Sequence, residues 1–135
     1  MEMQNLAVIT IGELTTLTTS RSRGKEAVQK LASRLHEFPE GTTILLDLTS
    51  SPVVSMSFLD ELVLETSRRG VDKSPAIAFR LGTTRHLAQL EEICTLRKTK
   101  CFYQYGADGP IRKTRRRTIP TTLANEYPGA FFDSV

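Results

Sequence analysis

The strongest constraint on the fold is an apolar run that stops at an aspartate and is followed by a polar loop and a helical pattern. Residues 44–46 (ILL) form the run, and Asp47 closes it. A short unbroken apolar run between turn residues is typical of a strand that is buried on both faces. Residues 49–52 (TSSP) then predict a loop, and residues 57–69 predict a helix with Gly70 just beyond its end.

The N-terminus of this helix is the candidate binding surface. Ser57 is predicted to be the N-cap, with Asp60 three residues later as a variant of the capping box. The carboxylates of Asp60 and Glu61 also suit the positive end of the helix dipole. Hydroxyl side chains are dense in and around the preceding loop: Thr49, Ser50, Ser51, Ser55 and Ser57. Burying so many polar groups would leave them in need of partners, so we expect an exposed loop with both carboxylates within reach of another protein.

Strands and helices alternate along the rest of the chain. Further strands are predicted at residues 6–11, 75–81 and 101–105, and further helices at about residues 22–38 and after Thr83 or Thr84. Thr15–Ser20 is either a short strand or a loop. This alternation predicts an α/β fold, in which a mixed sheet of about four to five strands packs with three main helices.

The composition changes after Gly106, and we predict one domain over residues 1–106 and an extension over residues 107–135. Prolines punctuate the extension, and five cations fall within six residues: Arg112, Lys113, Arg115, Arg116 and Arg117. Clustered arginines can bind the phosphates of nucleic acids, but this run lacks interleaved aromatic residues for base stacking. A solvated tail, or one that docks on a partner, is the favoured interpretation, because charge runs are commonly interaction tails.

Several function classes lack their sequence signals. Apolar runs are far shorter than a spanning helix requires, and the N-terminus lacks the form of a signal peptide, so we expect a cytoplasmic protein that does not enter a membrane. Cys94 and Cys101 form no metal-binding pattern, and we expect reduced thiols, no metal and no cofactor. We find no nucleophile elbow and no phosphate-binding glycine pattern, so no residue is predicted to be catalytic.

The central segment DLTSSPVVSMSFLDELV resembles STAS-like domains, which are related to bacterial anti-sigma-factor antagonists. The pattern Ser-x-Ser-Phe-x-Asp-Glu-Leu carries the resemblance, and the upstream segment Ser20–Gly24 adds to it. The resemblance covers about residues 6–105. It implies a STAS-like fold and a non-catalytic bacterial signalling or regulatory role, exerted by binding another protein. A GHKL-type ATPase or kinase is the implied partner.

In antagonist-type members of this family, a partner kinase phosphorylates a serine at the N-terminus of this helix. Aligning Asp47 with the family's strand aspartate puts Met56 on the phosphorylated serine, with Ser55 before it and Ser57 after it. The usual acceptor position is therefore lost, and Ser57 and Ser55 stay as candidate phosphorylation sites. A phosphate on Ser57 would gain from the helix dipole but would be repelled by the carboxylates that follow.

The predicted partner surface combines the loop, the start of the helix and the segment before the first helix. Its residues are Arg21, Arg23, Asp47, Thr49, Ser50, Ser55, Ser57, Asp60 and Glu61. The arginines join this set only if their loop lies alongside, since guanidinium groups suit carboxylates and phosphates. The alternative function is a nucleic-acid-associated regulator that uses the basic C-terminal run.

Overall fold

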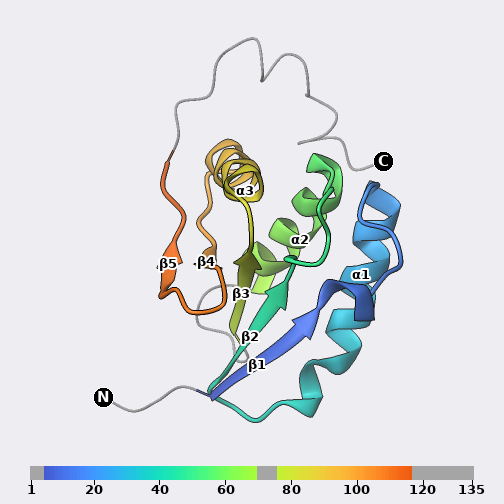
Figure 1. Cartoon of the computed structure of the whole chain (residues 1–135). Helices are drawn as coiled ribbons and strands as arrows, with labels where there is room; N and C mark the ends of the chain where they lie inside the picture. Colours follow the sequence, from blue (N-terminus) through green and yellow to red (C-terminus); the bar gives the residue numbers. More distant parts are fainter. Residues whose placement is uncertain (1–4, 70–75, 117–135) are drawn as a thin grey trace.

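A computed structural model describes residues 5–69 and 76–116, which form an α/β fold with one five-stranded sheet (Figure 1). The strands are β1 (Asn5–Thr10), β2 (Thr42–Asp47), β3 (Ala76–Leu81), β4 (Phe102–Tyr105) and β5 (Ile111–Lys113). The helices are α1 (Arg21–Arg34), α2 (Met56–Arg69) and α3 (Thr84–Leu96), with short 3-10 turns at η1 (Ile11–Glu13) and η2 (Leu35–Glu37). The predicted α/β class, with three helices and a mixed sheet, is confirmed.

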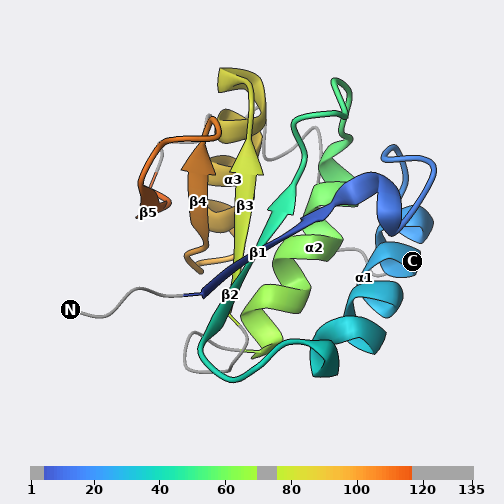
Figure 2. The ribbon, with the colours of Figure 1, turned by 60° about the horizontal axis from the view of Figure 1, so that its bottom comes forward.

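The strands lie in the order β1-β2-β3-β4-β5; the first four are parallel and β5 is antiparallel to β4. Each of α1, α2 and α3 connects two neighbouring parallel strands. Because such crossovers share one handedness, successive helices are placed on the same face of the sheet. Figure 2 shows the three helices together behind the sheet, with α2 between α1 and α3.

The core lies between this helical layer and the sheet. Ile44 and Leu46 of β2 and Phe79 of β3 belong to the buried apolar cluster on that side. The predicted inner face of α2 is confirmed, because all four of its members are buried: Phe58, Leu59, Leu62 and Val63. Successive side chains of a strand point to opposite faces of the sheet, so Leu45 lies on the face opposite to that of Ile44 and Leu46. It is also completely buried.

Several element boundaries differ from the sequence prediction. Helix α1 begins at Arg21, because Ser20 accepts a hydrogen bond from the Arg23 amide and caps it. Residues 15–20 form a loop and not a strand. Strand β5 extends the sheet within the segment that was assigned to the C-terminal extension. The predictions made for Gly70, Pro75 and Arg117 lie outside the described residues.

No helix in the described part of the chain is both long and apolar enough to cross a membrane.

Candidate functional site: the loops before α1 and α2

Two loops leave the carboxyl ends of β1 and β2 and are hydrogen-bonded to each other. The Thr18 hydroxyl donates to the Val53 carbonyl at 2.6 Å, and the Ser55 amide donates to the Thr18 carbonyl at 3.0 Å. The loop before α1 therefore lies directly beside the loop before α2, an arrangement that the sequence left open. These two contacts join residues that are more than thirty positions apart, so only the parallel pairing of β1 with β2 can bring them together.

Asp47 shapes the beginning of the second loop. Its Oδ1 atom accepts hydrogen bonds from the Thr49 amide at 2.8 Å and from the Thr49 hydroxyl at 2.6 Å. Aspartate side chains commonly accept a hydrogen bond from the backbone two residues later and so form a turn where a strand ends. The other oxygen lies 3.7 Å from the guanidinium of Arg80, so both carboxylate oxygens have partners within the fold. Thr49 and Ser50 are exposed at the tip of the loop, as predicted.

The predicted cap of α2 is wrong by two residues. The Phe58 amide donates to the Ser55 hydroxyl at 3.1 Å, and the helix begins at Met56, so Ser55 is the N-cap and Ser57 lies in the first turn. Ser55 takes this role because its own amide is held by Thr18, while Met56 packs against the core. The Ser57 hydroxyl lies 3.4 Å from that of Ser55, and both side chains are half-buried.

The expectation that Asp60 and Glu61 present their carboxylates to a partner is also wrong. Arg97, at the end of α3, donates to both oxygens of Asp60 at 2.8 and 2.6 Å. Arg21, at the start of α1, reaches Asp60 at 3.0 Å and Glu61 at 2.6 Å. Asp60 is completely buried and Glu61 is nearly so. Asp60 therefore pairs inside the molecule with arginines from two other helices, and it does not act as the second half of a capping box.

The electrostatics of this cluster follow from its burial. Burial raises the pKa of Asp60 even though hydrogen bonds from Arg97 and Arg21 favour the charged carboxylate. Burial disfavours the charged guanidinium of Arg21, but the hydrogen bonds to Glu61 and Asp60 outweigh it and raise the pKa of Arg21. The cluster links α2 to the start of α1 and to the end of α3 by ion pairs, in a place where water contributes little screening.

The two predicted arginines therefore differ in their surroundings. Arg21 belongs to the buried cluster, whereas Arg23 pairs with Glu26 at 3.0 Å on the surface of α1. The Arg23 side chain is 40% exposed, so it stays accessible from solvent beside the paired loops. Of the two, only Arg23 is placed to meet a partner with its guanidinium.

Two apolar side chains that the sequence analysis passed over stand out on the paired loops. Leu17 is 51% exposed and Val53 is 60% exposed, each within one residue of the hydrogen bonds that join the loops. We call the exposed residues Leu17, Thr49, Ser50 and Val53 the loop surface. In the sequence, an apolar residue within a Thr- and Ser-rich segment was the available signal for an exposed apolar side chain. The spacing of residues along the chain could not show that the two loops pair.

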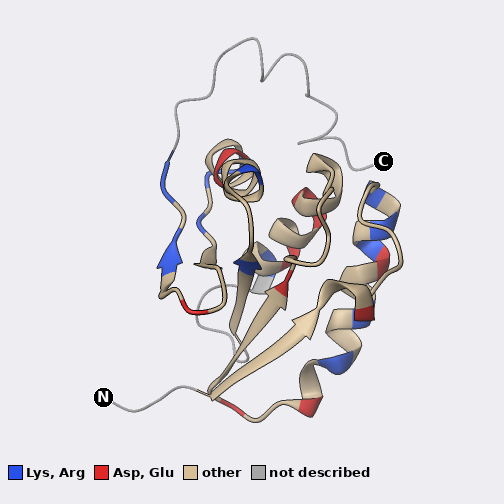
Figure 3. Cartoon of the chain, in the orientation of Figure 1, with Lys and Arg blue, Asp and Glu red and all other residues tan. Residues whose placement is uncertain are grey.

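The basic run lies elsewhere on the molecule. Figure 3 shows its cations along β5 and the segment after it, at the edge of the sheet away from α1. Arg112, Lys113, Arg115 and Arg116 are all exposed, and the ammonium of Lys113 lies 5.8 Å above the centre of the Phe102 ring. Arg115 and Arg116 also line a pocket of about 270 Å³ at the end of α3, together with Lys98 and Lys100. The fold thus adds two cations to the run.

The described residues hold no group of three or more histidine, cysteine or acidic side chains placed to bind a metal ion. In open α/β sheets, ligands bind where the strand order reverses, and the order of β1 to β5 is sequential throughout. His36 is exposed, whereas His86 is buried in the first turn of α3, where burial lowers its pKa. The loop surface offers hydroxyls, backbone groups and two apolar side chains, a set that suits binding.

Comparisons of the chain with protein-family models, with curated proteins and with solved structures returned no match.

Proposed function

We propose that this protein is a non-catalytic regulatory domain that binds another protein through the loop surface. The observation that carries the proposal is the hydrogen-bonded pairing of the two loops, each of which carries an exposed apolar side chain, Leu17 on one and Val53 on the other. Loops that are hydrogen-bonded to each other need little ordering on binding, and exposed apolar side chains on hydroxyl-rich loops suit a protein partner.

The proposed partner is a GHKL-type ATPase or kinase in a bacterial signalling system. Support comes from the resemblance of residues 47–63 to the central segment of STAS-like domains, whose kinases meet this part of the fold. In this proposal, Arg21, Asp60 and Glu61 act by fixing the position of α2, since their charges are satisfied inside the molecule. Ser55 and Ser57 stay candidate phosphorylation sites.

To test this, the full chain is purified from its native host and the ATPase bound to it is identified. The Kd of the complex between the two proteins is then measured by surface plasmon resonance. Val53→Glu and Leu17→Glu should each weaken binding by about tenfold or more, since each places a charge in an apolar contact. The double variant Arg115→Ala/Arg116→Ala is the matched control on the basic edge and should bind as the wild type does. Unchanged binding by folded loop variants would contradict the proposal.

The alternative proposal is a nucleic-acid-associated regulator, and one specific observation favours it. Arg115 and Arg116 of the basic run line one pocket together with Lys98 and Lys100, which the sequence did not connect with them. In that case a labelled duplex DNA should bind with an affinity that falls steeply with salt, and Arg115→Ala/Arg116→Ala should reduce both affinity and salt dependence. Val53→Glu should leave this binding unchanged, which separates the two proposals.

A further inference from the structure

The two cysteines lie together at the end of α3, with one of them facing a pocket. A left-handed residue, Lys98 (φ 56°), turns the chain directly after the helix, and the Thr99 amide closes the turn by donating to the Cys94 carbonyl at 2.9 Å. This helix-ending turn sends the chain back toward β4, so that Cys101 comes to lie beside Cys94. Both thiols are free and buried.

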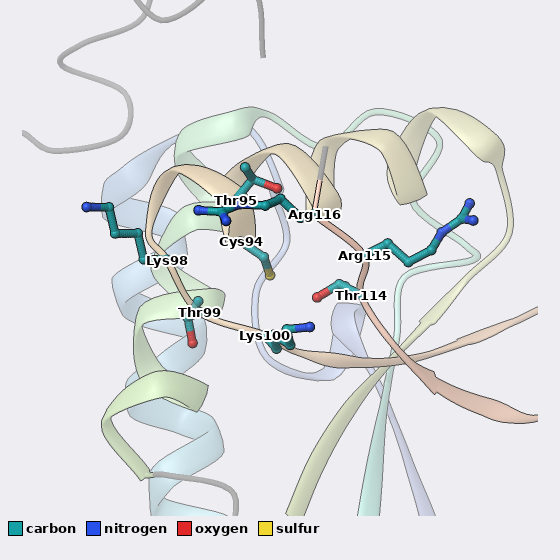
Figure 4. A pocket seen from close by; sticks show the side chains of 8 residues that line it. All are labelled: Cys94, Thr95, Lys98, Thr99, Lys100, Thr114, Arg115 and Arg116. Carbon is teal, nitrogen blue, oxygen red and sulfur yellow. The ribbon is translucent and has the colours of Figure 1, made fainter. Parts of the chain in front are cut away.

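The surroundings of the two thiols are unequal. Cys94 forms part of the pocket wall, and Figure 4 shows its sulfur and the Thr114 hydroxyl directed toward each other. Cys101 lies behind it, next to the Thr66 hydroxyl of α2, with 3.6 Å between the sulfur and that oxygen. The Thr114 hydroxyl already accepts a hydrogen bond from the Cys101 amide at 3.1 Å, which leaves its own hydrogen to donate to Cys94.

This asymmetry makes Cys94 the more acidic thiol of the two. The hydrogen bond from Cys101, together with that from Thr114, lowers the pKa of the Cys94 thiol, while burial and the charge of Glu91 oppose the shift. The same hydrogen bond to Cys94, together with burial, raises the pKa of the Cys101 thiol. Cys94 is thus the nucleophilic sulfur and Cys101 the proton donor that stands beside it.

The pocket decides which reagent can reach Cys94. Four cations line it, Lys98, Lys100, Arg115 and Arg116, and positive charge at a pocket favours a departing hydroxide. Cys94 is only 1% exposed, so a bulky disulfide cannot approach its sulfur in line, whereas a small oxidant fits within about 270 Å³. We propose that Cys94 and Cys101 are a redox-active thiol pair that a small hydroperoxide, entering through this pocket, oxidises to an intramolecular disulfide.

The chemistry has two steps. The Cys94 thiolate attacks one oxygen of hydrogen peroxide; a sulfur–oxygen bond forms, the oxygen–oxygen bond breaks, and hydroxide leaves, which gives a sulfenic acid. The sulfur of Cys101 then attacks the sulfur of Cys94, and its proton leaves with the hydroxyl group as water. The two sulfurs together lose two electrons, and the peroxide gains them. A thiol reductant restores the pair.

The test treats the reduced full chain with hydrogen peroxide and follows its intact mass and its disulfide-linked peptides. We expect the loss of two hydrogen atoms and a peptide that joins Cys94 to Cys101. Cys101→Ser should stop the reaction at a sulfenic acid on Cys94, which dimedone traps, while Cys94→Ser should leave Cys101 unmodified. If the wild-type chain keeps both thiols, or is oxidised beyond sulfenic acid without forming the disulfide, the proposal is wrong; this readout requires no variant.

The role of the pocket has its own control. Lys100→Gln/Arg116→Gln should slow disulfide formation by about threefold to tenfold, because the departing hydroxide loses two of the four cations that line the pocket. Lys30→Gln removes an exposed cation from α1, far along the chain from the pocket, and should leave the rate unchanged. Equal rates in all three proteins would show that the cations around Cys94 play no part in the reaction.

Discussion

Ser55 begins α2 because a backbone contact from a distant loop fixes it in place. Its amide donates to Thr18, and its hydroxyl is then turned toward the Phe58 amide, one of the donors that the first turn of a helix leaves unsatisfied. Ser57 has the same chemistry but sits inside the first turn, where an N-cap role is closed to it. Position relative to the loop, and not residue type, decides which serine caps the helix.

We predict that Ser55→Ala lowers the free energy of unfolding by about 1 kcal/mol, because the Phe58 amide loses its acceptor. Ser57→Ala is the matched control and should change it by less than about 0.5 kcal/mol, as expected for a residue outside the cap. Urea unfolding followed by circular dichroism measures both. A larger loss in Ser57→Ala than in Ser55→Ala would place the start of the helix where the sequence alone put it.

Asp60 shows how burial sets the balance of a charge cluster. Its carboxylate receives two hydrogen bonds from Arg97 and one from Arg21, yet burial still raises its pKa. Because the folded pKa lies above the unfolded value, the ionised carboxylate costs stability at neutral pH. That cost is relieved as the pH falls through the folded pKa toward the unfolded one.

Arg97→Met should therefore destabilise the protein by about 3 kcal/mol at neutral pH, since it leaves a buried carboxylate with one partner fewer. The loss should shrink on mild acidification, because Asp60 can then take up a proton and needs no counter-charge. Arg34→Met, which removes the partly exposed partner that α1 provides for Glu13, is the control and should cost less than about 1 kcal/mol. A loss in Arg97→Met that stays constant with pH would show that Asp60 does not titrate in this range.

At the scale of elements, α1 and α2 pack closely because a glycine lies between them. A Cβ atom added to Gly24 would sit 2.8 Å from the Cβ of Glu61 and 3.0 Å from the Phe58 carbonyl oxygen. Only a residue without a side chain allows this approach, and the approach in turn lets Arg21 reach the acidic pair on α2. The glycine therefore serves the packing of two helices and not the flexibility of one.

Gly24→Ala should destabilise the protein by about 1–3 kcal/mol through overpacking, although alanine is the better helix former by up to about 1 kcal/mol. Gly12→Ala is the control, because nothing lies within 4 Å of the added Cβ atom there. It should be close to neutral in thermal unfolding. A gain of stability in Gly24→Ala would show that α1 and α2 can move apart without a loss of packing energy, which would contradict the prediction.

At the scale of the whole molecule, one strand organises the fold. Strand β2 pairs with β1 on one side and with β3 on the other, and its helix-facing residues contact the core. Leu45 stands in register with Val8 and Ala78 and is completely buried, whereas Val8 is 45% exposed. The sheet is thus best protected along β2, and it opens toward the β1 edge.

Leu45→Ala should lower the free energy of unfolding by about 2–5 kcal/mol, as expected for a buried leucine that leaves a cavity. Val8→Ala, its neighbour in register, should cost less than about 1.5 kcal/mol, because its side chain is half-exposed already. Denaturant unfolding of both variants gives the comparison. Equal losses would show that burial does not differ between the two strands.

Local patterns determined the elements of this protein. The run at residues 44–46, the apolar face of α2 and the alternation of strands with helices were sufficient to predict the α/β class and most strands, because burial and periodicity act along the chain. They also predicted that Thr49 and Ser50 would be exposed. Short elements with weak patterns were not predicted. Strand β5 has only three residues, all exposed, and it is defined by its pairing with β4.

Only the tertiary structure decided the site. Asp60 and Glu61 fit a helix N-terminus by sequence, yet arginines from α1 and α3 enclose them, at separations of 37 to 40 positions that no local pattern encodes. The pairing of the two loops, which selects Ser55 as the cap and joins Thr18 to Val53, depends likewise on the register of β1 with β2. Residue type sets what a side chain can do; the partners that the fold brings to it decide what it does.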